Sequence, residues 1–237
     1  AGVVGINDAG HVVGNLPYSI DLTRTGFLRE ASGLSTSIQF PGAWSTSIID
    51  INDAGQILGT YASDRSLRAF LREPTGDFTT LDFSGLGLNL IENGLYSENT
   101  LVLLTGLNDR GEIVGDVVGS GVGGTFVRDS AGAFTMLDEI FNLIGTTGIN
   151  DSGQIIGIVN EDGVRGFVRD SDGRQTVFEV PGASRTEPRG INDAGQIVGY
   201  FQDEFGYHGF LATPVPVPPA LPLFGAALSL VMMRRRR

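Results

Sequence analysis

The sequence contains no cysteine and no lysine, and it has only two histidines. The missing cysteines exclude a disulfide framework, thiol catalysis and cysteine-ligated zinc. Two histidines are too few for the three-histidine sites that hold catalytic zinc. The sequence also lacks a Gly-x-Ser-x-Gly elbow, a phosphate loop and a His-Glu-x-x-His helix. With 27 acidic residues, paired carboxylates are the catalytic arrangement left to consider.

Positive charge is also scarce, and all of it comes from arginine. The formal net charge is −11, and four of the 16 arginines stand together at the end of the chain. The rest of the protein is therefore strongly acidic and repels nucleic acid phosphates, which excludes DNA and RNA as partners. An acidic surface instead favours solubility and weak binding of divalent cations.

Glycine is abundant, with 35 residues, and much of it belongs to a five-fold repeat. Each copy has the pattern Gly-Ile-Asn-Asp-x-Gly-x-Ile-Val-Gly or a close variant, and the asparagines are 45, 56, 42 and 42 residues apart. Asn-Asp-x-Gly between apolar runs predicts a hairpin turn, because Asn and Asp side chains bond the nearby backbone and Gly adopts a positive φ. The asparagines are Asn7, Asn52, Asn108, Asn150 and Asn192.

A Phe-Leu-Arg-Glu line or a variant of it recurs in each unit, and after a glycine turn a line like Phe-Thr-Thr-Leu-Asp follows in three of them. Each unit of about 42 residues therefore supplies about four short strands, as in one blade of a β-propeller. We predict an all-β domain over residues 1–213 with about five blades. The fifth unit ends near Thr213, before its outer strand, so a truncated larger ring or an open array of sheets is the alternative.

The repeated lines resemble the HAF repeat family of bacterial extracellular proteins, in which a His-Gly-Phe line follows the asparagine motif. His208-Gly209-Phe210 keeps that histidine, and the other four copies replace it. The resemblance covers about 210 residues. It implies an exported β-rich repeat domain and brings no settled biochemical activity.

The repeated aspartates have two interpretations. Catalysis needs one asymmetric site, so residues that recur in every unit favour a structural role in the turn. Calcium is the functional competitor, because these turns and the segment Glu161-Asp162-Gly163 offer oxygen ligands, although they lack the spacing of an EF-hand loop. The candidate calcium ligands are Asp8, Asp53, Asp109, Asp151 and Asp193.

An insertion from Leu86 to Thr100 interrupts the repeat. It mixes apolar residues with polar ones, and long loops on a regular scaffold often carry recognition. A neutral insertion is the alternative. The polar residues are Asn89, Glu92, Asn93, Tyr96, Glu98 and Asn99.

The character of the chain changes at Pro214. We expect residues 214–219, which are rich in proline, to form an extended linker. We expect residues 220–237 to form a short hydrophobic helix that ends in the arginine cluster. Ala220 to Met233 carries no charge and would be about 21 Å long as a helix, against a hydrocarbon core of about 30 Å. A buried helix in an otherwise β protein is the alternative.

This tail closely resembles the PEP-CTERM sorting signal, with a Pro-rich signature, a short membrane helix and a basic terminus. The segment 215–218 reads Val-Pro-Val-Pro and resembles a variant in which valine replaces the usual glutamate. The resemblance implies an upstream signal peptide, a transient inner-membrane anchor, processing by an exosortase-like enzyme, and release to the cell surface or exopolysaccharide matrix. The sorting residues it implies are Val215, Pro216, Pro218, Arg234, Arg235, Arg236 and Arg237.

The preferred hypothesis is therefore an exported, non-enzymatic surface or matrix protein, without a cofactor unless calcium binds, whose acidic repeats bind glycans, cations or neighbouring proteins. The alternative is a secreted carbohydrate-active enzyme, a glycoside hydrolase or lyase, with two carboxylates at the mouth of a propeller. A third interpretation treats the repeats as a structural spacer.

Overall fold

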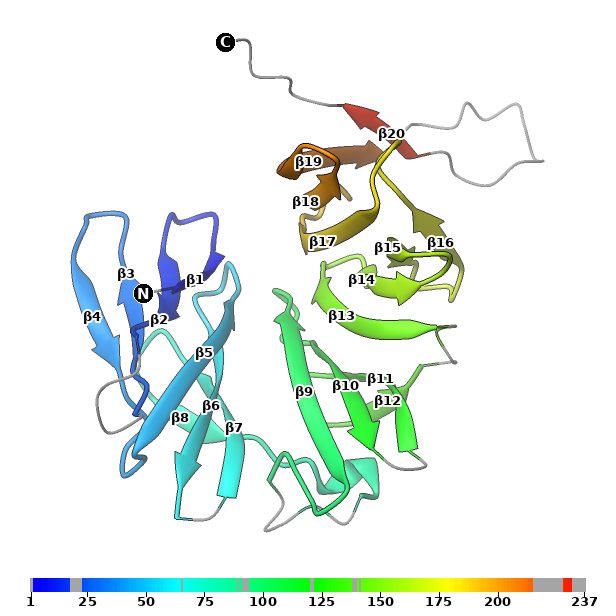
Figure 1. The fold of residues 1–237 in the computed structure, drawn as a ribbon. Coiled ribbons are helices and arrows are strands. Elements are labelled where there is room, and N and C mark those ends of the chain that lie inside the picture. Colours follow the sequence, from blue (N-terminus) through cyan, green and yellow to red (C-terminus); the bar gives the residue numbers. More distant parts are fainter. Residues whose placement is uncertain are drawn as a thin grey trace. The chain divides into compact units, whose positions relative to one another are not determined.

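The structure is a computed structural model, and it describes residues 2–17, 23–64, 66–88, 90, 94–119, 122–137, 140, 142–214 and 228–231. Five groups of four antiparallel strands follow one another along the described chain (Figure 1). The chain divides into two compact units, Ala1–Leu137 and Asp138–Arg237. The predicted all-β fold with four strands in each repeat is confirmed.

The first unit contains three repeats, and each is a separate four-stranded sheet. Within each sheet the strands lie in sequence order, each paired with the next. The first sheet consists of β1 (Gly2–Ile6), β2 (Val12–Asn15), β3 (Gly26–Arg29) and β4 (Ser35–Ile38). The second consists of β5 (Ser45–Ile51), β6 (Ile57–Ser63), β7 (Ser66–Arg72) and β8 (Phe78–Thr80). The third consists of β9 (Thr100–Leu107), β10 (Ile113–Gly119), β11 (Val122–Arg128) and β12 (Phe134–Met136).

The second unit contains the fourth and fifth repeats, which are joined by one parallel bridge between Val164 and Arg185. The fourth repeat consists of β13 (Leu143–Ile149), β14 (Ile155–Asn160), β15 (Val164–Arg169) and β16 (Gln175–Phe178). The fifth consists of β17 (Arg185–Ile191), β18 (Ile197–Asp203), β19 (Gly206–Pro214) and β20 (Leu228–Val231).

Strand β20 corrects two expectations about the end of the chain. The fifth repeat does have a fourth strand, because β20 pairs antiparallel with β19 from Leu211↔Val231 to Pro214↔Leu228. The helix expected over residues 220–237 is therefore wrong for residues 228–231. The unpaired edge of β19 offers backbone partners to a Leu-Ser-Leu-Val segment, which alternates as a strand does. Within the described residues, no helix has the length and apolar character needed to span a bilayer.

The first strand of every repeat carries a β-bulge, three residues before the asparagine of the turn. A bulge bends the strand and redirects the side chains that follow it. The same irregularity therefore presents the turn in the same way in all five repeats. The bulged residues are Val4, Ile49, Thr105, Thr147 and Arg189.

The glycine that ends each Ile-Val-Gly segment makes room for the phenylalanine of the next strand. At Gly59 an added Cβ would lie 2.4 Å from the Phe70 ring and 2.6 Å from the Ser47 carbonyl oxygen. Gly59 and Phe70 are direct partners in the β6–β7 ladder. Phe70 is fully buried, so the pair explains why both lines of the repeat recur together.

The hydrophobic cores lie between the sheets of consecutive repeats. One cluster joins Val13 and Ile38 of the first repeat to Ile48, Ile51 and Phe70 of the second. A second cluster joins the second and third repeats, and a third joins the fourth and fifth. Each repeat is thus stabilised by its neighbour, as expected for a repeat protein.

The described part of the insertion at 86–100 packs against the scaffold. Leu95 is buried, its N–H donates to the Leu67 carbonyl oxygen over 2.8 Å, and its carbonyl accepts from Val102. Tyr96 bridges to Leu101. These contacts favour a packing role for this end of the insertion. Asn89, Glu92 and Asn93 lie outside the described residues.

Candidate functional site

The Asn-Asp-x-Gly segment forms the same closed turn in every repeat. In the first repeat the N–H of Asn7 donates to the His11 carbonyl over 3.1 Å, and the Gly10 N–H donates to the Asn7 carbonyl over 2.9 Å. The Asn7 side-chain oxygen accepts the His11 N–H over 2.9 Å. The glycine of the turn has φ between +73° and +77° in all five copies, a conformation that other residues rarely adopt. The predicted turn is confirmed.

The asparagine side chains also connect one repeat to the next. The side-chain amide nitrogen (Nδ2) of Asn7 donates to the Asn52 carbonyl over 3.1 Å. Asn52 Nδ2 donates to the Asn108 carbonyl over 3.0 Å, and in the second unit Asn150 Nδ2 donates to the Asn192 carbonyl over the same distance. Asn7, Asn52, Asn108 and Asn150 are buried. Asn7, Asn52 and Asn150 therefore each close their own turn with the side-chain oxygen and bind the following turn with the side-chain nitrogen.

The aspartates add a second bond at each of these junctions. The backbone N–H of Asp8 donates to the Asp53 side-chain oxygen Oδ1 over 2.7 Å. The Asp53 N–H donates to Asp109 Oδ1 over 2.6 Å, and the Asp151 N–H donates to Asp193 Oδ1 over 2.8 Å. We call the two series of bonds together the turn ladder. It runs in one direction, because the donor always belongs to the earlier repeat.

The turn ladder bears on the calcium hypothesis. In Asp53, Asp109 and Asp193 one carboxylate oxygen already accepts a backbone N–H. In the second unit, carboxylate oxygens of Asp151 and Asp193 lie within 4.8 Å of each other. Calcium takes six to eight oxygen ligands, so this pair could supply only part of a coordination shell. The carboxylates of Asp53, Asp109 and Asp193 therefore have a structural role in the turn ladder, and a cation at Asp151 and Asp193 stays a proposal.

Asp50 occupies a position that is glycine in the other four repeats. It is partly buried in β5, and its two carboxylate oxygens accept the N–H groups of Ile51 over 2.9 Å and of Leu107, in the third repeat, over 3.0 Å. Burial of the carboxyl group raises the pKa of Asp50 to about 6, despite these two bonds. Sequence analysis missed Asp50, although its departure from the repeat was a visible signal.

The fifth repeat contains a buried carboxylate that sequence analysis also missed. Glu187 is 1% exposed and forms ion pairs with Arg185 and with Arg189, the latter over 2.6 Å. The Tyr200 hydroxyl donates to Glu187 over 2.6 Å and accepts from Arg189 over 2.8 Å. Burial alone would raise the pKa of Glu187, but the bonds from Tyr200 and Arg185 and the two positive charges lower it. Glu187 is thus held ionised, which suits a structural ion pair rather than a general acid.

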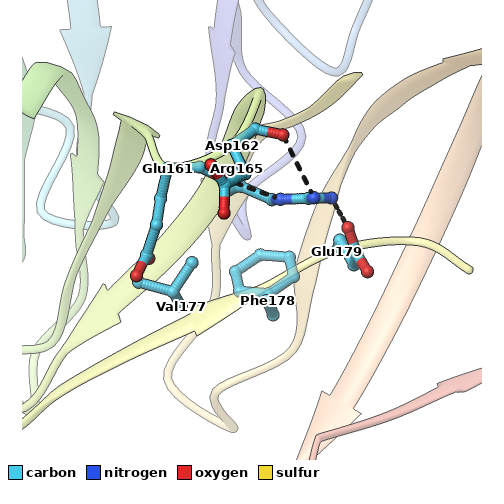
Figure 2. A pocket seen from close by; sticks show the side chains of 6 residues that line it. All are labelled: Glu161, Asp162, Arg165, Val177, Phe178 and Glu179. Carbon is cyan, nitrogen blue, oxygen red and sulfur yellow. Dashed lines mark hydrogen bonds and ion pairs between the residues drawn. The ribbon is translucent and has the colours of Figure 1, made fainter. Parts of the chain in front are cut away.

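The fourth repeat has a shallow surface pocket of about 360 Å³, lined in part by Glu161, Asp162 and Glu179 (Figure 2). Arg165 lies across it. Its guanidinium donates to the backbone carbonyls of Glu161 over 3.2 Å and Asp162 over 3.4 Å, and it pairs with the Glu179 carboxylate. Two carbonyl oxygens of the 161–163 turn, a segment that the sequence offered as a source of calcium ligands, therefore bind a cationic side chain of the protein itself.

His208 keeps the histidine of the repeat pattern and contacts its own hairpin. Its Nε2 lies 3.2 Å from the Asp203 carboxylate, and its ring lies beside Phe201. The sorting residues predicted in the tail lie outside the described residues. These are Val215, Pro216, Pro218, Arg234, Arg235, Arg236 and Arg237.

No protein-family model matches the sequence, and no curated protein matches it. Solved structures do match. TolB from Acinetobacter baumannii has a TM-score of 0.59 at 14% identity, over 88% of this chain and 50% of that one. A putative TolB from Agrobacterium tumefaciens has a TM-score of 0.57 at 12% identity, over 86% of this chain and 78% of that one.

A virginiamycin B lyase from Staphylococcus aureus also matches, with a TM-score of 0.49 at 12% identity, over 88% of this chain and 69% of that one. The chain spans about half the length of the Acinetobacter protein. At these identities the likeness concerns the fold alone. Four-stranded antiparallel blades in sequence and the TolB matches define a scaffold of the β-propeller class.

Proposed function

We propose that this chain is an exported, non-enzymatic protein of the cell surface or exopolysaccharide matrix. The observation that carries the proposal is the turn ladder. The asparagines and aspartates of the repeated turn form hydrogen bonds within the turn and to the turn of the next repeat. A structural role in the scaffold is therefore enough to explain the repeated Asn-Asp-x-Gly motif, and no catalytic role is needed.

The buried carboxylates support the same proposal. Asp50 accepts two backbone N–H groups, and Glu187 is neutralised by two arginines and a tyrosine. A glycosidase needs one protonated carboxyl group beside the scissile bond and a second carboxylate opposite it. Glu187 is held ionised, so it does not suit the first role.

The ligand we propose is an acidic exopolysaccharide bound through calcium. A chain with net charge −11 repels a polyanion directly, so a divalent cation has to bridge the two. Asp151 and Asp193 offer neighbouring carboxylates for this purpose, and a polysaccharide carboxylate would complete the oxygen shell that they leave open.

The test is retention on immobilised alginate, an acidic exopolysaccharide, with calcium or with a chelator. We expect retention with calcium only, and none on neutral dextran. Asp151→Asn with Asp193→Asn should weaken retention, while the exposed pair Asp77→Asn with Asp172→Asn serves as the matched control. Failure to bind alginate with calcium present would count decisively against this ligand.

We further propose that the tail directs sorting and is removed by an exosortase-like enzyme. The support is the Pro-rich signature at 215–218 followed by an uncharged run and four arginines. In a bacterium that carries such an enzyme, the released protein should lack the arginine cluster by mass spectrometry. Replacing Val215, Pro216 and Pro218 by alanine should leave the chain unprocessed and membrane-associated. Release of this triple variant at the normal rate would contradict the proposal.

A secreted carbohydrate-active enzyme is the second candidate, and the pocket on the fourth repeat favours it. Three acidic residues contribute to its lining. If it were catalytic, Glu179→Gln would abolish release of reducing ends from a polysaccharide. Arg165→Gln would change the pH profile, because its guanidinium pairs with Glu179. Equal activity in wild type and Glu179→Gln would exclude this site.

A further inference from the structure

The carboxylate of Asp50 lies where the backbones of two consecutive repeats meet. One of its oxygens accepts the Ile51 N–H of the same repeat over 2.9 Å, and the other accepts the Leu107 N–H of the next repeat over 3.0 Å. Two backbone N–H groups from neighbouring repeats therefore hold one carboxylate between them. Hydrogen bonds from N–H groups to an ionised carboxylate are among the stronger ones in proteins. In the first unit, this pair of donors is occupied by a side chain of the protein itself.

The junction between the fourth and fifth repeats has the same backbone arrangement without the carboxylate. Gly148 corresponds to Asp50, because each directly follows the bulge of its strand and has the same place in its ladder. By the same comparison, Ile191 of the fifth repeat corresponds to Leu107 of the third. Gly148 has no side chain that could accept the N–H groups of Ile149 and Ile191.

The bonds of the turn ladder hold the two junctions in the same geometry. At both, the side-chain nitrogen of the earlier turn asparagine donates to the carbonyl of the later one over 3.0 Å. The N–H of the following aspartate donates to the next aspartate's carboxylate, over 2.6 Å at one junction and 2.8 Å at the other. The turn asparagines directly follow Ile149 and Ile191, so the N–H groups of these two residues are placed as those of Ile51 and Leu107 are.

The N–H groups of Ile149 and Ile191 point away from their own ladders. The next N–H along the chain, that of Asn150, donates across the ladder to the Gln154 carbonyl over 3.0 Å, and successive N–H groups of a strand point to opposite sides. Strand β13 is the terminal strand of its sheet, and β17 is bridged to β15 only at its opposite end. Within the described ranges of the chain, no oxygen accepts either N–H group. Two aligned donors at this edge therefore remain for a ligand.

We propose that the N–H groups of Ile149 and Ile191 bind the carboxylate of an external ligand, as those of Ile51 and Leu107 bind Asp50. The ligand class is an organic carboxylate, either a small free acid or a uronate group of an acidic polysaccharide. Turn aspartates follow two residues later at both junctions, so their negative charge does not keep a carboxylate from this position. The site needs no cation and is therefore independent of the calcium contact proposed above.

The test is a titration of the full-length protein with sodium acetate and with sodium glucuronate, followed through the backbone amide resonances by NMR. The titrations are run at pH 7.5 and constant ionic strength, with a chelator present to exclude calcium. We expect saturable shifts at the amides of Ile149 and Ile191 with both carboxylates, and none with neutral glucose. Absent or non-saturable shifts at these two amides in the wild-type chain would overturn the proposal.

Gly148→Asp should fill the site from within, as Asp50 does in the first unit. The added Cβ would be 3.7 Å from Ile156, an ordinary contact, so the backbone can keep its place. We expect this variant to bind acetate at least tenfold more weakly. Gly209→Asp is the matched control, because it adds the same charge in the same unit at an exposed position, and it should bind acetate as wild type does. Unchanged binding in Gly148→Asp would also overturn the proposal.

A further titration distinguishes the two sources of the carboxylate. An oligomer of uronate residues that binds at least tenfold more tightly than acetate would identify an acidic polysaccharide as the ligand, because neighbouring sugars would add contacts. Equal affinity for acetate and the oligomer would identify a small free acid. Because calcium is excluded, failure of this site and failure of retention on alginate are separate results.

Discussion

At the scale of single residues, Asp50 shows how a repeat accommodates an exception. The other repeats have glycine at this position, and here a carboxylate bonds the backbone of the next repeat at Leu107. Its pKa of about 6 lies above the ordinary value of an aspartate side chain, so the folded protein binds the proton more tightly than the unfolded chain does. Folding stability contributed by this group therefore falls as the pH rises from about 4 to about 6.

Asp50→Asn removes this titration and keeps a side-chain oxygen for the Ile51 N–H. Relative to wild type, Asp50→Asn should become more stable by about 1–3 kcal/mol between pH 4 and pH 7, while loss of the oxygen that accepts the Leu107 N–H costs the same at every pH. Urea unfolding across this pH range measures it. The exposed Asp77→Asn is the control, and a difference that does not vary with pH would contradict the assignment.

The turn asparagines allow one substitution to be compared in two contexts. Asn52→Asp keeps the oxygen that accepts the Gln56 N–H but loses the nitrogen that donates to the Asn108 carbonyl, and it buries a charge. We expect a loss of about 2–4 kcal/mol of unfolding free energy. Asn192→Asp, at the exposed end of the turn ladder, should cost less than about 1 kcal/mol. An equal loss of unfolding free energy at both positions would show that the bond from Asn52 to the Asn108 carbonyl does not contribute to stability.

At the scale of elements, the pairing of Gly59 with Phe70 links adjacent strands. Gly59→Ala should destabilise the protein by about 3 kcal/mol, because the new Cβ meets both the ring and the Ser47 carbonyl. Adding Phe70→Leu should recover part of the loss, which a double-mutant cycle measures. Gly2→Ala is the control, since no atom lies within 4 Å of its added Cβ. Strict additivity of the two substitutions would contradict this account.

A second prediction at this scale concerns the effect of removing strand β20. A chain that ends at Pro214 lacks the partner of β19. The amides of Leu211 to Thr213 should then exchange with deuterium faster, while those of β17 and β18 keep their protection. Hydrogen exchange followed by mass spectrometry compares the two forms. Unchanged exchange at β19 would mean that the strand does not depend on β20.

The sequence predicted the elements better than the contacts between them. Asn-Asp-x-Gly specified the turn because the chemistry of that turn is local. The same motif does not indicate that Asn52 Nδ2 donates to the Asn108 carbonyl, 56 residues away. Strand β20 was missed for a similar reason, since its apolar residues fit a membrane helix as well as a strand, and the edge of β19 decides between them. Glu187 was missed because its partner Tyr200 lies directly opposite it in the β17–β18 ladder, a pairing that the local sequence does not show.

At the scale of the whole molecule, net charge opposes compaction. The formal charge of −11 is spread over repeats that each expose acidic turns, so self-repulsion should be relieved by salt. We expect the midpoint of thermal unfolding to rise by a few degrees between low salt and about 0.3 M sodium chloride. Calorimetry measures it, and sucrose at matched osmolality is the control. A midpoint that falls with salt would indicate that attractive ion pairs such as Arg189–Glu187 dominate instead.

The turn ladder has a consequence for how such a protein can change over generations. Each junction within the two units uses the same donor and the same acceptor, so a duplicated repeat already has the groups that bond the repeats on either side. The loss of one whole unit likewise leaves its former neighbours able to bond each other. Lineages can therefore lengthen or shorten the array in steps of about 42 residues without inventing a new interface. Copy number is the property of this architecture that selection can alter most readily.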